Sequence, residues 1–163
     1  MKKIYAIAIM LLLAIGAHAQ EGKRLYNKYS DSENVSAVYI SPAMFKIIGK
    51  IPELNVELGE GENYDLAPLI SSFSGFYMLD ICNKPLADEL HAEVKNMISK
   101  GRYEMLMEIK DDGTVVRIYT AGNEKTIESF IFIANESDET TFFCLEGAMN
   151  RSDVENLIAI AAK

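Results

Sequence analysis

The chain has 163 residues, and its 24 acidic residues outnumber its 16 lysines and arginines, which gives a net charge of −8. Such a body repels phosphate backbones and anionic lipid surfaces unless a local basic patch overrides the charge. The sequence holds no lysine or arginine cluster, so nucleic acid is excluded as an expected partner.

The first stretch of the chain has the three parts of a secretory signal peptide. Lys2 and Lys3 precede the apolar run at residues 4–15, and a small-x-small site follows at residues 17–19. This pattern predicts cleavage after Ala19. A membrane anchor is the alternative, but it needs about 20 apolar residues, and this run is well short of that.

Export sets the expected organisation of the rest of the chain. The residue directly after the predicted cleavage site is Gln20 and not a cysteine, so we expect no lipid-anchored product. We expect residues 20–163 to form a single domain, located in the periplasm or outside the cell and not spanning the membrane. The length suits one hydrophobic core.

The segment from 21 to 49 predicts a helix, a strand and a second helix. Leu25, Tyr26 and Tyr29 share one face of the first helix, and residues 35–40 form a β-rich run. Ser41 and Pro42 then have the composition of a helix N-cap and first helical residue. Met44 and Phe45 in this second helix form a candidate docking site for a partner; the alternative is that both pack on the sheet.

An acidic stretch follows between residues 52 and 65. Its carboxylates include Glu57, Glu60 and Glu62, and oxygen ligands of this kind suit calcium. The spacing does not match the known calcium loop, however. A calcium-binding module is therefore one hypothesis for this stretch, and a solvated loop is the other.

The remainder of the chain predicts an α+β fold. The apolar stripe of residues 85–100 indicates an amphipathic helix, and Ser152 with Glu155 indicates a capping box that begins a second one. We expect an antiparallel-dominated sheet of about six strands, covered mainly on one face by these two helices. Alternating apolar patterns place the strands at residues 35–40, 76–82, 103–110, 114–120, 127–134 and 140–145.

The residues with catalytic chemistry do not assemble into a known constellation. His91 is the only histidine after residue 19, so no Ser/His/Asp set exists without it, and neither zinc spacing nor a phosphate loop occurs. We expect no catalytic residue, metal or cofactor. The alternative is a carboxylate-dependent hydrolase that uses acids on strands, namely Asp80, Glu104 or Glu108, with Asp80 foremost because it interrupts an apolar strand.

Two cysteines, Cys82 and Cys144, lie in predicted strands of an exported chain. One disulfide between them is compatible with an oxidising compartment. It would close a loop of 62 residues (144 − 82) and contribute roughly 4 kcal/mol in the chain-entropy model. The alternative is two buried thiols that act as small apolar groups.

Three further segments carry a resemblance to a known family. They are the run VYISPAMF at residues 38–45, YEMLM at 103–107 and EGAM at 146–149 before the last helix. Together with the exported start, they resemble the family catalogued as domain of unknown function 4252. The resemblance implies a small exported protein of Gram-negative bacteria of the Bacteroides type, and it brings no catalytic residue. Some relatives lie beside sigma-factor genes, which implies a part in envelope signalling.

The sequence as a whole predicts an exported, non-enzymatic binding or interaction protein of the bacterial envelope. The secretion signal, the lack of a catalytic constellation and the apolar pair Met44/Phe45 favour this interpretation. The expected partner is a protein of the envelope. The hydrolase and the calcium-binding module are the alternatives.

Overall fold

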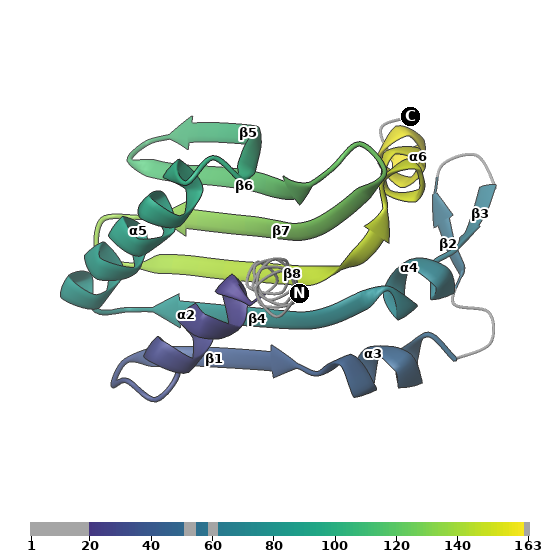
Figure 1. Ribbon diagram of the computed structural model, residues 1–163. Coiled ribbons are helices and arrows are strands. Elements are labelled where there is room, and N and C mark those ends of the chain that lie inside the picture. Colours follow the sequence, from purple (N-terminus) through teal and green to yellow (C-terminus); the bar gives the residue numbers. More distant parts are fainter. Residues whose placement is uncertain (1–19, 51–54, 59–61, 162–163) are drawn as a thin grey trace, which may run out of the picture.

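The computed structural model describes residues 20–50, 55–58 and 62–161. Within these ranges, six strands form one antiparallel sheet and two more form a separate hairpin (Figure 1). This confirms the predicted α+β class with a six-stranded sheet. In spatial order the sheet strands are β1 (Val35–Ile40), β4 (Phe73–Ile81), β8 (Thr140–Asn150), β7 (Thr126–Asn135), β6 (Thr114–Gly122) and β5 (Tyr103–Asp111).

The turn between β5 and β6 shows how local sequence fixes the sheet. Asp112 and Gly113 both have positive φ angles, of 40° and 89°. Asp tolerates this region better than most residues, and Gly adopts it without steric cost. The two residues therefore close the hairpin in a register that places Asp111 opposite Thr114.

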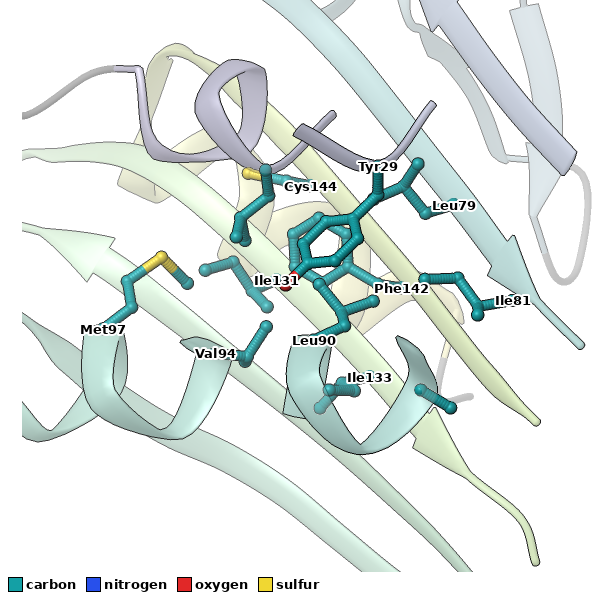
Figure 2. Packing of buried hydrophobic residues seen from close by; sticks show 12 residues of the cluster. Tyr29, Leu79, Ile81, Leu90, Val94, Met97, Ile131, Ile133, Phe142 and Cys144 are labelled. Carbon is teal, nitrogen blue, oxygen red and sulfur yellow. The ribbon is translucent and has the colours of Figure 1, made fainter. Parts of the chain in front are cut away.

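One face of the sheet is covered by two helices, α2 (Glu21–Tyr29) and α5 (Lys84–Ser99), which lie in front of it in Figure 1. The Asn83 side chain caps α5 by accepting a hydrogen bond of 3.2 Å from the Leu86 N–H. Figure 2 shows Tyr29 and Leu90 pointing into one cluster between helices and sheet. The buried cluster comprises Leu25, Tyr29, Leu79, Ile81, Ala87, Leu90, Val94, Met97, Ile131, Ile133, Phe142 and Cys144.

The second helix that covers this face is therefore α2 and not, as predicted, the C-terminal helix. Helix α6 (Arg151–Ala161) follows β8 without a linker, so it begins where the strand leaves the sheet. Its Val154 packs on Ile127 and Met149 in a second, smaller core. The N-terminal cap also differs from the predicted Ser152/Glu155 box, because the side chain of Asn150 accepts hydrogen bonds from both the N–H and the hydroxyl of Ser152.

Two short helices and the hairpin gather near α6 at the same end of the sheet (Figure 1). Helix α3 (Pro42–Ile48) begins as predicted, with the Ser41 side chain accepting from the Met44 N–H. Helix α4 (Ala67–Ser71) precedes β4. The hairpin of β2 (Asn55–Leu58) and β3 (Glu62–Asp65) lies in the stretch expected to be a solvated loop. Each strand has four residues, which is too short for a clear alternation in the sequence.

Candidate functional site

The sheet face opposite α2 and α5 presents three rows of side chains, which we call the open face. Residues that are directly opposite in an antiparallel pair point to the same side of the sheet, so the register assigns each row. The central row is apolar on all six strands and consists of Val38, Met78, Phe143, Phe132, Ile118 and Met107. The second row is Ile40, Phe76, Leu145, Phe130, Thr120 and Glu104, and the third is Ser36, Asp80, Thr141, Ala134, Val116 and Ile109.

The central row is open to solvent along its whole length. Val38 at one end is 45% exposed, and Met107 at the other end is 48% exposed. The four residues between them are partly exposed, although the strands that carry them lie in the interior of the sheet. Their neighbours on the other face, such as Leu79 and Phe142, are fully buried. The sheet thus has one dry face and one apolar face that contacts water.

Aromatic rings hold the centre of the open face in place. Phe132 and Phe143 stack with their centroids 4.6 Å apart and their planes 3° from parallel. Phe76 lies 5.8 Å from Phe143 in a tilted arrangement. Aromatic pairs of this kind contribute about 0.5–1.5 kcal/mol beyond the area they bury. The surface is therefore preorganised on a rigid sheet.

The sequence contains a signal for this surface in two of the strands. Residues 127–134 and 140–145 are apolar on both faces, a pattern that is typical of strands covered on both sides. The strands are central in the sheet as expected. Among the described side chains, part of the second face is covered where Phe130 and Leu145 pack against the small core of Ile127, Met149 and Val154.

Charge on the open face is entirely negative. Its three rows contain Asp80 and Glu104 and no lysine or arginine. Glu139 adds a further carboxylate beside Asp80, at the end of β8. The face is therefore an apolar surface with acids at two of its corners.

The candidate pair Met44 and Phe45 is divided between surface and core. Met44 is 47% exposed, whereas Phe45 is 7% exposed and packs edge-on against Phe73 with ring centroids 5.2 Å apart. Phe45 thus anchors α3, and Met44 alone points to solvent, where it lines a shallow cavity with Tyr39 and Ile40. This cavity adjoins the open face at β1.

The cysteines are both free thiols, so the disulfide between Cys82 and Cys144 does not form in this fold. Cys144 lies opposite Tyr77, five residues before Cys82 on the neighbouring strand. Five residues span roughly 16 Å along a strand, whereas a bridge needs α-carbons within about 7 Å. Cys144 is buried, as the alternative expected, and Cys82 is exposed.

Asp80, the foremost catalytic candidate, lies at a corner of the open face. It accepts a hydrogen bond of 2.9 Å from the Thr141 hydroxyl. Ligand atoms of Asp80, Cys82 and Glu139 lie within 4.8 Å of one another. Repulsion from Asp80 raises the pKa of Glu139 above its ordinary value. The sequence singled out Asp80 but gave no sign of Glu139, which follows a turn.

The other acids and the histidine are placed apart from this corner. Glu108 forms ion pairs with Arg117 and Lys110, and these bonds lower the pKa of its carboxyl. His91 is half-buried on α5, on the opposite side of the sheet. Of the calcium candidates, Glu60 lies outside the described residues, while Glu57 and Glu62 belong to β2 and β3, where only the backbone is described.

A buried carboxylate that sequence reasoning missed joins α2 to the sheet. Glu146 is 4% exposed, and it accepts a hydrogen bond of 3.0 Å from the Gly22 N–H in the first turn of α2. Burial raises the pKa of Glu146 to about 7, while the Gly22 N–H opposes this rise. The negative charge at a helix N-terminus suits the helix dipole. In the sequence, Glu146 directly follows the predicted strand at residues 140–145, and this position does not indicate burial, although the residue lies within β8.

No helix within the described ranges has both the length and the apolar character needed to cross a lipid bilayer. Comparison with curated proteins and with solved structures finds no match. A family model does match, over residues 29–157, which include all six strands of the sheet and both α3 and α5. The chain belongs to the family described as a domain of unknown function (DUF4252).

Proposed function

We propose that the protein is an exported, non-enzymatic interaction protein of the bacterial envelope that binds a partner protein through the open face. The observation that carries this proposal is the central row, in which six strands in succession present an apolar side chain to solvent. Soluble proteins seldom leave contiguous apolar patches of several hundred Å² exposed without a binding role.

The dimensions of the open face suit the apolar centre of an interface with a protein partner. Six strands about 4.8 Å apart span roughly 24 Å, and three rows extend the patch along the strands by roughly 14 Å. Interfaces of ordinary size bury about 800 Å² on each partner, with an apolar, aromatic centre and a polar rim. The stack of Phe132 on Phe143 supplies such a centre, and the acids at the corners supply part of the rim.

The charges indicate which kind of partner fits. Asp80 and Glu139 lie at one corner of the apolar rows and Glu104 at another, and the chain as a whole has a net charge of −8. A second copy of the same chain would bring like charges together, and anionic lipids would be repelled for the same reason. The matching surface is therefore an apolar patch with lysine or arginine at its edges, on a different protein.

Methionines at the edge of the face favour binding by adaptable packing. Met107 is 48% exposed on β5, the outermost strand, next to the exposed Leu106, and Met44 is 47% exposed beside β1 at the other edge. Methionine is flexible and polarisable, which allows one surface to fit partners of different shape. The signal-peptide pattern at residues 1–19 supports a location in the envelope, where the partner is sought.

The test is site-specific photo-cross-linking in living cells. A photoreactive amino acid replaces Val38 or Met107, at opposite ends of the central row. The matched control replaces the exposed Asn96 on α5, on the helix-covered side of the sheet. We expect one protein to be captured from both ends of the row and not from the control. A charge placed inside the row, as Ile118→Lys, should abolish this product while the far-ultraviolet circular dichroism of the protein stays unchanged.

Two outcomes would contradict the proposal. The first is equal capture from Asn96 and from the central row, because it would indicate unspecific contact. The second is the absence of any product from both Val38 and Met107 in cells that contain the folded protein.

A further inference from the structure

A cavity on the helix-covered side of the sheet has the features of a ligand site. It measures about 330 Å³ and lies between α5 and the strands β6 and β7. Its lining consists of residues of α5 between His91 and Ser99 together with Arg117, Tyr119 and Ile133 of the two strands. This volume is at the lower end of the range for small-molecule pockets, about 300–1,000 Å³.

The floor of the cavity is apolar. Val94 on α5 and Ile133 on β7 are 2% and 3% exposed and belong to the main core; Figure 2 shows both side chains between helix and sheet. Ile98 and the ring of Tyr119 complete the lining toward the opening and pack against the same core. A hydrocarbon or aromatic group placed here would contact packed side chains on several sides and leave water.

The rim of the cavity is basic, in a chain that is otherwise acidic. Lys95 and His91 from α5 and Arg117 from β6 line it, and no carboxylate does so among the described residues. Lys95 is exposed and forms no ion pair with any described residue. The site therefore combines a dry floor with a basic rim in which Lys95 has no ion-pair partner among the described residues.

Arg117 is held in position for an anion. Its Nε donates a hydrogen bond of 2.7 Å to Glu108, which also pairs with Lys110 at 2.8 Å. This contact orients the guanidinium, while its two terminal nitrogens make no further bond to the described residues. Arginine binds a carboxylate with two parallel hydrogen bonds when both donors are free.

We propose that this cavity binds a small amphipathic carboxylate, with the acid group at Lys95 and Arg117 and an aliphatic or aromatic tail on Val94, Ile98 and Ile133. The cavity lies on the other side of the sheet from the open face, so this site is independent of the proposed partner surface. Charge complementarity selects the anion, and the apolar floor selects against small hydrophilic acids such as acetate.

Methyl NMR spectroscopy of the purified protein tests the site with octanoate as the probe. We expect saturable shifts of the Val94, Ile98 and Ile133 methyl signals, with a dissociation constant on the order of 1 mM, as for a ligand of about ten heavy atoms. Octyltrimethylammonium has an alkyl tail of similar length and the opposite charge. It should bind at least tenfold more weakly.

A pair of matched variants separates recognition of the ligand's charge from unspecific hydrophobic binding. Lys95→Glu reverses a charge at the rim and should weaken octanoate binding at least tenfold, whereas Lys46→Glu makes the same change on the exposed side of α3 and should leave it unaltered. The proposal is overturned if octanoate leaves the three methyl signals unmoved at 10 mM, or shifts those of Val38 and Ile118 on the open face instead. Equal binding of the two octyl compounds would also overturn it.

Discussion

Glu146 is the residue whose environment departs furthest from what its chemistry favours. It is an ionisable side chain 4% exposed, bonded to the Gly22 N–H and 3.9 Å from the Cys144 sulfur. Its pKa is raised to about 7 from 4.5. The folded protein consequently holds the proton more tightly than the unfolded chain does, and folding stability depends on pH through this group.

The sign of this dependence gives the first prediction. Stability should be greatest below about pH 5 as far as Glu146 is concerned, and should fall as pH rises through 7, by on the order of 2–3 kcal/mol. Glu146→Gln keeps an acceptor for Gly22 and removes the charge. Urea unfolding at pH 5 and pH 8 should show a smaller loss for the variant, which should exceed the wild type in stability at pH 8. Equal pH dependence of both proteins would refute this account of Glu146.

The two cysteines give a second prediction at the same scale. Cys82 is exposed, and residual burial together with Glu139 and Asp80 raises the pKa of its thiol. Cys144 is 0% exposed, and burial followed by repulsion from Glu146 raises its pKa to about 12. A chromogenic disulfide reagent should therefore label one thiol per native chain, faster at alkaline pH, and two after unfolding without reductant. Finding no thiol after unfolding would show that the cysteines are bridged.

Sequence alone predicted single residues well where chemistry is local and poorly where it depends on distant strands. Ser41 caps its helix as expected, because a cap acts within three residues. Glu146 and the neighbours of Asp80 could not be predicted in this way, since Gly22 is 124 positions from Glu146 and Thr141 is 61 from Asp80. The sequence pattern did not distinguish the exposure of Phe45 from that of Met44. Phe45 is buried because its ring packs against Phe73, which is distant in the sequence.

At the scale of elements, the close approach of α2 to β8 depends on one glycine. A β-carbon on Gly22 would lie 2.7 Å from the Cys144 sulfur and 2.8 Å from its β-carbon, which is closer than such atoms approach. Helix α2 also reaches α5 through Glu93, which accepts hydrogen bonds from Lys28, from Arg24 at 2.9 Å and from the Tyr29 hydroxyl at 3.0 Å. The helix is thus fixed both to the sheet and to its neighbour.

The third prediction follows from that contact. Gly22→Ala should destabilise the protein by about 1–3 kcal/mol, because overpacking outweighs the gain in helix propensity of roughly 0.5–1 kcal/mol. The matched control Lys23→Ala changes the adjacent exposed residue and should stay within about 0.5 kcal/mol of the wild type. Chemical denaturation measures both. A stabilised Gly22→Ala protein would mean that α2 does not pack on Cys144.

The elements themselves were largely predictable, and their placement was less so. The alternating pattern of apolar residues identified β5, and the apolar stripe identified α5. Asp112 and Gly113 are residues typical of the tight turn that joins β5 to β6. The choice between α2 and α6 as the second cover was not readable from amphipathicity, since both helices have an apolar side. It is decided by connection, because α6 starts directly at the end of β8 and has no linker to fold back over the sheet.

In the described part of the molecule the two main helices, α2 and α5, lie on one face of the sheet, and this asymmetry is the basis of the proposed function. An antiparallel sheet with one covered face usually carries polar residues on the other. Here the central row is apolar on every strand, from Val38 to Met107. The sequence predicted helix cover mainly on one face. The tertiary structure shows that α2 and α5 provide this cover, while the central row of the other face is open to solvent.

Binding of an apolar dye to the isolated protein should reflect this asymmetry. The fourth prediction is that Ile118→Lys, in the central row, reduces the fluorescence of the apolar dye ANS bound to the native protein. Asn96→Lys on α5 adds the same charge on the helix-covered side of the sheet and should leave the dye signal near that of the wild type. If both variants lower the signal equally, charge alone explains the effect and the open face is not the apolar surface that the dye detects.

The measurement that tests the central claim most directly is the affinity of the purified protein for the partner captured from Val38 and Met107. Calorimetric titration would compare the wild type with Val38→Lys, Met107→Lys and Asn96→Lys. The account predicts at least a tenfold loss of affinity for each of the first two, about 1.4 kcal/mol, and none for the third, with affinity falling as salt increases. Unchanged affinity in both central-row variants would contradict the claim that the open face is the binding surface.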